Sequence, residues 1–360
     1  MQLSGPKRAI VMVVLLLGWL AAASWAGSAK ILLYHHVAED TPRSTSVSPR
    51  SFDSHMRLLE DEGYRVVRLQ QIIAALVAGD TIDSRWVAIT FDDGYRSVLT
   101  AAAPRLKKRG WPFTVFVNSD YADQGQGEYL GWEELRRLEK MGATIGNHSR
   151  AHDHLVWRRA DEDHDAWQGR VAADIIHAQQ RLEAELENPA RVFSYPYGEF
   201  DSALSGLMTS LGFVSLGQQS GPVGVGTNPY AIPRFPLGTG FDDVRSVAEK
   251  LRTEYLPLID PPVPATILGE DALPPTLRLR VDTESARVSQ LNCFVNGQPN
   301  AAVRWTDAET GELEVVAERT LRAGRSRYTC TAPVAGRSGV YYWHTHLWIK
   351  PLAEGSWYSE

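Results

Sequence analysis

The sequence predicts an α/β protein with a distorted or incomplete (β/α) barrel, followed by a small all-β sandwich. Between residues 30 and 253, apolar runs with strand character alternate with helical patterns, as in proteins with parallel sheets. After a proline-dense stretch at 256–276 the helical patterns stop and short alternating runs follow. Because about seven strand–helix units precede this change, a barrel is favoured over a doubly wound open sheet.

The first region contains the barrel elements. Strands are expected at 30–34, 86–91, 113–117, 143–146, 191–195, 213–216 and 230–235, and helices near 52–62, 69–78, 95–109, 131–141, 160–187, 200–211 and 242–253. The helix at 95–109 has basic residues in its last turn and Gly110 directly after it, which is a conventional stop signal. In either α/β architecture, functional residues lie at the carboxyl ends of the strands.

The second region is expected to form the sandwich. Its strand-like runs are 277–281, 288–295, 302–306, 313–317, 326–331 and 340–349. Cys293 and Cys330 are the only cysteines, and in an exported protein such a pair predicts a disulfide. Together with Trp305 and Tyr328 they are similar to the Cys–Trp–Cys pattern of immunoglobulin-like sandwiches, although the spacing between the cysteines is short.

The last strand-like run places Tyr342, His344, His346 and Trp348 on one face. An exposed aromatic face would suit sugar rings. Burial in the core, or against the barrel, is the favoured interpretation.

The N-terminus has the order of a secretory signal peptide. Lys7 and Arg8 precede an apolar run at 9–23, and small residues at 24–26 offer a cleavage site. The run is shorter than the ~20 residues that a spanning helix needs, so cleavage is favoured over a retained membrane anchor. We therefore expect export to the periplasm or the cell exterior. The expected domains are a signal peptide at 1–26, a barrel domain at 27–255, a Pro-rich linker at 256–276 and the sandwich at 277–360.

Composition excludes several classes of function. Hydrophobic residues make up 44% of the chain and charged residues 22%, as in ordinary soluble proteins. The net charge of −6 argues against nucleic-acid binding, and no nucleotide cofactor is implied. Because cysteine is absent from the barrel region, a metal there must be bound by histidine and carboxylate.

Two adjacent carboxylates follow the apolar run that ends at Phe91. Successive residues that leave a strand point in different directions. Asp92 and Asp93 can therefore take different roles, one binding a metal and the other facing a substrate. The simpler interpretation is a helix cap, which suits a lone aspartate better than two in a row.

Two histidines follow the strand at 143–146. His148 and His152 are four residues apart, close enough to share a metal ion. His154 leaves two other pairings open, and the pair His148/His152 is preferred. With one carboxylate the pair would make a site with open coordination positions. Zn²⁺ is the favoured metal ion, and Co²⁺, Ni²⁺ or Mn²⁺ are alternatives.

Three motifs together resemble the NodB-homology polysaccharide deacetylases, carbohydrate esterase family 4, over roughly residues 30–250. They are TFDDG at 90–94, HSRAH at 148–152 and RVFSYPYG at 191–198. The opening ILLYHHV at 31–37 is similar to the branch that includes biofilm poly-β-1,6-N-acetylglucosamine deacetylases. The resemblance implies hydrolysis of N-acetyl groups on an N-acetylated polysaccharide. Poly-β-1,6-N-acetylglucosamine is the favoured polymer, with chitin-like or peptidoglycan glycans as alternatives.

The resemblance also implies roles for individual residues. Asp92 would be the general base, and Asp93, His148 and His152 the metal ligands. His35 would be the general acid in preference to His36, and the backbone N–H of Tyr197 would contribute to the oxyanion hole.

One position departs from the family pattern. Many members have an arginine two residues before the Pro-aromatic pair, where it orients the base, and this chain has Ser194 there. Arg191 is expected to take that role, with Arg234 as an alternative, unless the base is tuned without an arginine.

Two other functional classes stay open at this stage. One is a catalytically silent glycan-binding or assembly protein on a deacetylase fold, and the other is an amidase of a small molecule. The C-terminal β-domain could also bind a partner protein.

Overall fold

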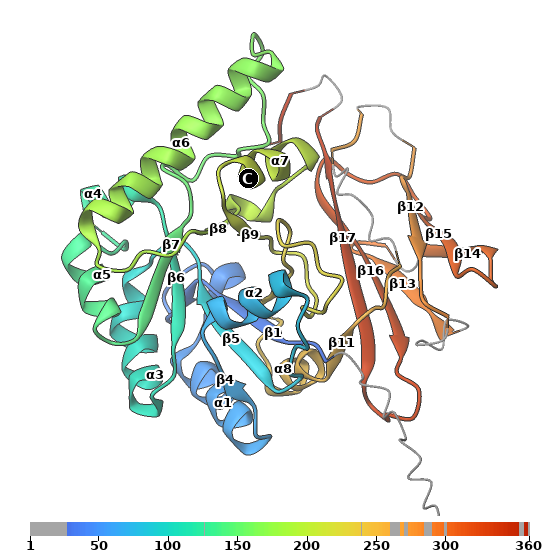
Figure 1. Ribbon diagram of the computed structural model, residues 1–360, viewed down its shortest axis with the longest axis horizontal. Helices are drawn as coiled ribbons and strands as arrows, with labels where there is room; N and C mark the ends of the chain where they lie inside the picture. The colour runs from blue at the N-terminus through green and yellow to red at the C-terminus, as the bar shows by residue number, and fades with distance from the viewer. Residues whose placement is uncertain are drawn as a thin grey trace, which may run out of the picture.

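The computed structural model describes residues 27–125, 127–238, 240–259, 267–269, 273–283, 290–298, 301–352 and 356–358. It shows a curled sheet surrounded by helices, next to a set of C-terminal strands (Figure 1). The signal peptide expected at 1–26 lies outside the described residues. Among the residues that are described, no helix is long and apolar enough to cross a membrane.

The curled sheet is entirely parallel and confirms the expected distorted barrel. Its strands run in the order β10-β1-β5-β6-β7-β8-β9, and β4 pairs with β5. Their bounds are β1 (Lys30–Tyr34), β4 (Arg65–Val66), β5 (Trp86–Phe91), β6 (Phe113–Val117), β7 (Ala143–Asn147), β8 (Val192–Ser194), β9 (Val214–Leu216) and β10 (Phe235–Pro236). A separate small pair joins β2 (His36–Val37) to β3 (Ser46–Val47).

One segment of the chain joins the two edges of this sheet. Ile232 donates its N–H to Ser215 O of β9 at 3.0 Å, and Leu237 donates to Leu33 O of β1 at 2.9 Å. The residues between them therefore cross from one edge to the other. Arg234 lies in this crossing, and its side chain is fully buried.

Helices cover the outside of the sheet (Figure 1). They are α1 (Pro49–Asp61), α2 (Leu69–Ala78), α3 (Ala103–Arg109), α4 (Ser119–Gln124), α5 (Trp132–Glu139), α6 (His164–Glu185), α7 (Ser202–Ser210) and α8 (Val244–Leu251), with short helical turns at η1 (Arg43–Thr45), η2 (Val98–Ala102) and η3 (Pro196–Gly198). The helix expected at 95–109 divides into η2, which is π-helical, and α3. Pro104 accounts for the change, because it has no N–H to donate to the preceding turn.

The C-terminal strands form two sheets around a second core. The sheets are β11-β17-β16-β13 and β12-β15-β14. Their bounds are β11 (Thr253–Tyr255), β12 (Thr276–Arg280), β13 (Asn292–Val295), β14 (Ala301–Asp307), β15 (Glu312–Ala317), β16 (Gly324–Pro333) and β17 (Tyr341–Lys350). Leu256 and Leu258, from the proline-dense stretch, are buried in this core.

The expected disulfide between Cys293 and Cys330 is present. It joins β13 and β16, which are neighbours in one sheet, because the two cysteines are directly opposite each other in the strand register. An immunoglobulin-like disulfide would join the two sheets. The similarity to that pattern is therefore corrected: the architecture is a sandwich, but its disulfide lies within a sheet.

The strand β17 packs against both parts of the protein. Tyr342 and Trp348 are buried in the sandwich core, as the favoured interpretation of this face required. Leu347 and Ile349 instead belong to the core formed with α6 and α7. Over residues 347–349 the strand is thus covered on both faces, and it joins the sandwich core to the core formed with α6 and α7.

Candidate active site and metal centre

The candidate site lies at the carboxyl ends of the barrel strands. The register pairs Tyr34 of β1 with Phe91 of β5, so the next residues, His35 and Asp92, leave the sheet at the same level. Asp93 follows directly, and His148 follows β7. The strand ends therefore bring residues from distant parts of the sequence to one place, as expected for a barrel.

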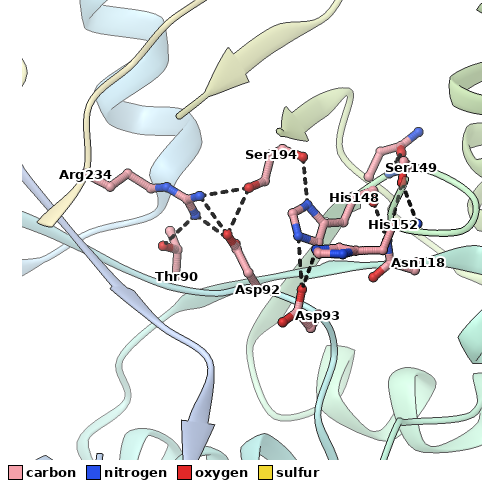
Figure 2. Close-up of polar contacts among 10 residues, drawn as sticks. Thr90, Asp92, Asp93, Asn118, His148, Ser149, His152, Ser194 and Arg234 are labelled. Carbon is pink, nitrogen blue, oxygen red and sulfur yellow. Dashed lines mark hydrogen bonds and ion pairs between the residues drawn. The ribbon is translucent and has the colours of Figure 1, made fainter. Parts of the chain in front are cut away.

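Three predicted ligands converge at this edge (Figure 2). Asp93 Oδ1 lies 3.1 Å from His148 Nε2 and 3.2 Å from His152 Nε2. The three ligand atoms all lie within 4.8 Å of one another. This group does not include His154, whose Nδ1 lies 2.8 Å from a carboxylate oxygen of Glu199. The geometry therefore selects the pair His148/His152 from the three pairings that the sequence left open.

The loop that carries the histidines is held by its own polar groups. Asn147 Oδ1 accepts the N–H of Ser149 at 2.8 Å, and Ser149 Oγ accepts the N–H of His152 at 3.0 Å. The main chain is left-handed at Ser149, His152 and Asp93, with φ of 72°, 62° and 69°. Such strain in non-glycine residues is typical of functional sites, where the surroundings enforce it.

The arrangement around His148 favours a bound cation. Its Nδ1 lies 2.7 Å from the carbonyl oxygen of Ser194, which can only accept, so Nδ1 carries the hydrogen of the neutral ring. Nε2 then directs a lone pair toward Asp93 Oδ1, and neither atom has a hydrogen-bond partner among the described residues. Two acceptors this close repel each other unless a proton or a metal ion lies between them. Two imidazole nitrogens and one carboxylate suit Zn²⁺ or another divalent transition metal.

A second group of possible ligands lies on the helices outside the barrel. Asp120 and Asp123 on α4 approach His177 on α6. Both carboxylates already have cationic partners: Arg150 lies 3.0 Å from Asp120 and Arg181 lies 2.6 Å from Asp123. This group is therefore a set of surface ion pairs rather than a second metal centre.

Asp92 occupies a different environment from Asp93. It is fully buried and receives two bonds from Arg234, from Nη1 to Oδ1 at 2.8 Å and from Nη2 to Oδ2 at 2.7 Å. Ser194 Oγ donates to the same Oδ2 at 3.0 Å (Figure 2). Burial by itself would raise the pKa of Asp92, but the charges of Arg234 and the neighbouring histidines outweigh burial and lower it. The carboxylate is thus kept ionised.

Arg234, and not Arg191, contacts the expected base, which corrects the first sequence expectation. Arg191 precedes β8, so it lies at the opposite end of the barrel from Asp92. Its side chain is exposed and lies 3.3 Å from Glu183. Arg234 reaches the site from the segment that closes the barrel. A charged residue inside the apolar run 230–235 was the sequence signal for it.

The two histidines after β1 lie in different surroundings. His35 is half-buried. Burial lowers its pKa, while the charges of Asp93 and Asp92 oppose the change. His36 is buried and stacks on Tyr95 with ring centroids 3.5 Å apart, and burial lowers its pKa to about 4. His36 is thus engaged in packing.

Tyr197 lies beside His152, one of the predicted ligands. The two ring centroids are 4.4 Å apart, and the opposite neighbour of Tyr197 is His154, whose ring is stacked at 3.7 Å. The main chain at Tyr197 is left-handed, with φ of 58°, between Pro196 and Gly198. The turn therefore places this residue at the rim of the candidate metal centre.

Comparisons with known proteins identify relatives of part of this chain. Residues 79–216 match the polysaccharide deacetylase family. The protein YxkH of Bacillus subtilis (strain 168) is 25% identical over 171 residues, which cover 48% of this chain and 57% of that protein. The poly-β-1,6-N-acetyl-D-glucosamine N-deacetylase of Escherichia coli (strain K12) is 24% identical over 234 residues, which cover 54% of this chain and 34% of the relative. The chain thus spans less than two thirds of either relative.

A solved structure shows the same fold. A de-N-acetylase from Aggregatibacter actinomycetemcomitans aligns with a TM-score of 0.55 and 21% identity, over 62% of this chain and 99% of that one. At this level of identity the likeness establishes the fold of the barrel region.

Proposed function

From the polysaccharide deacetylase domain that this chain carries, we propose that the protein removes N-acetyl groups from an N-acetylglucosamine-containing polysaccharide by metal-dependent hydrolysis. One observation carries the proposal. Three side chains that could bind a metal ion lie next to a separate buried carboxylate, Asp92, whose lowered pKa keeps it ionised. Amide hydrolysis needs these two parts, an electrophilic centre and a base for the attacking water.

The polymer proposed is poly-β-1,6-N-acetylglucosamine. Support comes from the ILLYHHV segment at the start of the barrel and from the described activity of the Escherichia coli relative. Chitin-like and peptidoglycan glycans are the alternatives. Zn²⁺ is the proposed metal ion, because its common ligands are those of this site.

Different residues would carry out the separate steps of the hydrolysis. Asp93, His148 and His152 would hold the metal ion, which supplies Lewis-acid polarisation of the acetyl carbonyl when bound. Asp92 accepts the proton of the attacking water, and the paired Arg234 keeps that carboxylate ionised beforehand.

Two further groups complete the mechanism. The backbone N–H of Tyr197 donates to the oxyanion that forms on the acetyl carbon, an interaction typically worth about 3–4 kcal/mol per donor. His35 gives a proton to the leaving nitrogen. The products are acetate and a free glucosamine unit.

We also propose that the chain acts outside the cytoplasm, in the periplasm or at the cell exterior. The signal-like segment at 1–26 and the disulfide support this location, because disulfides persist in oxidising compartments.

Acetate release from poly-N-acetylglucosamine tests the proposal. Activity should be lost on chelation and return with Zn²⁺ or Co²⁺. Asp92→Asn should lower kcat by about 100-fold or more, the usual contribution of a general base. Asp120→Asn is the matched control, because that carboxylate belongs to the surface ion pairs, and it should leave the rate unchanged. A metal-loaded protein that releases no acetate from this polymer, chitin or peptidoglycan fragments would refute the proposal and favour a glycan-binding protein.

A further inference from the structure

A buried carboxylate links the active-site rim to the C-terminal strands. Glu199, whose side chain is fully buried, follows the turn that contains Tyr197. His154 Nδ1 lies 2.8 Å from its Oε2, and Arg325 Nη1 from β16 lies 3.4 Å from its Oε1. The hydroxyl of Tyr358, beyond β17, also donates to Oε1. Residues from the sandwich side therefore supply two of the partners of this carboxylate.

Arg325 also contacts Tyr197 directly. Its Nη1 lies 3.5 Å from the carbonyl oxygen of Tyr197, and its guanidinium carbon lies 5.4 Å from the centre of the tyrosine ring. His154 is stacked on the same ring and nearly parallel to it, at an interplanar angle of 4°. Tyr197 is thus enclosed by Arg325, His154 and the ligand His152.

These contacts explain a backbone that would otherwise be unfavourable. A non-glycine residue at φ of 58° is strained and persists only when its surroundings enforce it. Within the turn, Gly198 N bonds to Tyr195 O at 2.9 Å and Glu199 N to Pro196 O at 3.1 Å. Arg325 holds this turn at two points, the carbonyl of Tyr197 and the carboxylate of Glu199.

We propose that Arg325 is a positioning residue: from the β-sandwich it fixes the turn that presents the backbone N–H of Tyr197 to the reaction. The inference rests on the proposed function. It gives the C-terminal strands a part in the active site of the barrel. It also assigns a role to His154, which supports the turn and does not bind the metal.

Kinetics of Arg325→Met provide the first test. A small displacement of an oriented group costs up to about 100-fold in rate, so we expect kcat to fall by about 10-fold or more while KM and metal content stay near the wild-type values. Arg325→Lys keeps the charge and should recover part of kcat. The matched control is Arg337→Met, because Arg337 pairs with another buried carboxylate of the C-terminal sheets, Glu254 of β11, at 2.9 Å. An equal loss of kcat in the control would show a general loosening of the C-terminal sheets and overturn the inference.

Hydrogen exchange separates this inference from the proposed function. In the full chain, the amides of Gly198 and Glu199 should exchange faster in Arg325→Met than in wild type, and not in Arg337→Met. Faster exchange in a protein that deacetylates no polymer would refute the proposed function and leave the positioning of the turn supported. Unchanged exchange at these amides would overturn the inference, whatever the activity.

Discussion

Replacing Arg234 by methionine tests the base and its partner in one experiment. In the native protein Arg234 donates twice to Asp92, once to Ser194 Oγ at 2.8 Å and once to Gly217 O at 2.8 Å. Both charged side chains are fully buried. Methionine keeps much of the volume but leaves a buried carboxylate with one hydroxyl donor. Removing one partner of a buried ion pair lowers the unfolding free energy by about 3–5 kcal/mol.

The same substitution should change the pH dependence of activity. Without the guanidinium, the burial of Asp92 is opposed by fewer positive charges, so its pKa rises. The base must be ionised to accept a proton. The acidic limb of the pH–rate profile for acetate release should therefore move to higher pH, and activity should fall more at acidic than at neutral pH.

Arg191→Met is the control for both measurements. Its side chain is exposed on the far end of the barrel, so the unfolding free energy should stay within about 0.5 kcal/mol of wild type. Denaturant titration measures the stability, and acetate release across acidic and neutral pH measures the profile. An acidic limb that stays in place in Arg234→Met, or that moves in Arg191→Met, would refute the reasoning.

Metal binding, the disulfide and one buried histidine each give a further expected outcome. His154→Ala should retain metal after dialysis and His148→Ala should lose it; metal loss in both would contradict the ligand assignment. Replacing Cys293 and Cys330 by alanine should lower the unfolding free energy by about 4 kcal/mol, because the bond closes a loop of 37 residues; a loss under about 1 kcal/mol in denaturant titrations would argue against the pairing. Burial lowers the pKa of His346 to about 3 in the folded protein. Below pH ~6.5 the imidazole becomes protonated in the unfolded chain while it stays neutral in the folded one. Unfolding therefore takes up a proton, and the unfolding free energy falls as the pH is lowered toward about 3. His346→Leu should reduce that slope by about 1.4 kcal/mol per pH unit, and an unchanged slope would count against the burial argument.

The elements that the sequence predicted well are those with strong patterns. The strands at 30–34, 86–91 and 113–117 were predicted at their observed bounds, because each is a continuous apolar run between polar residues. The short strand β4 and the six-residue helix α4 were missed. Neither is long enough to show a period, and both depend on tertiary contacts.

The candidate site could also be predicted only in part from the sequence. Asp92, Asp93 and His148 could be placed together from sequence, because each follows an apolar strand and the ends of parallel strands meet. The partner of Asp92 could not be chosen in this way. Arg191 and Arg234 both lie near strands, and only the direction of β8 and the closure of the barrel decide which one points inward.

Exchanging Ser194 and Arg234 tests whether the position of the guanidinium matters more than the strand that supplies it. Ser194 Oγ and Arg234 Nη2 both donate to Asp92 Oδ2 and lie 2.8 Å apart, so an arginine on β8 would reach the same carboxylate. Ser194→Arg alone would place two guanidinium groups in a filled site, and overpacking costs about 1–3 kcal/mol. With Arg234→Ser in the same chain, the volume and the ion pair are both kept. The double variant should therefore be more stable and release acetate faster than Arg234→Ser alone. If the double variant and Arg234→Ser are equally impaired, Asp92 requires an arginine from the segment that closes the barrel, and the position of the guanidinium group alone is not sufficient.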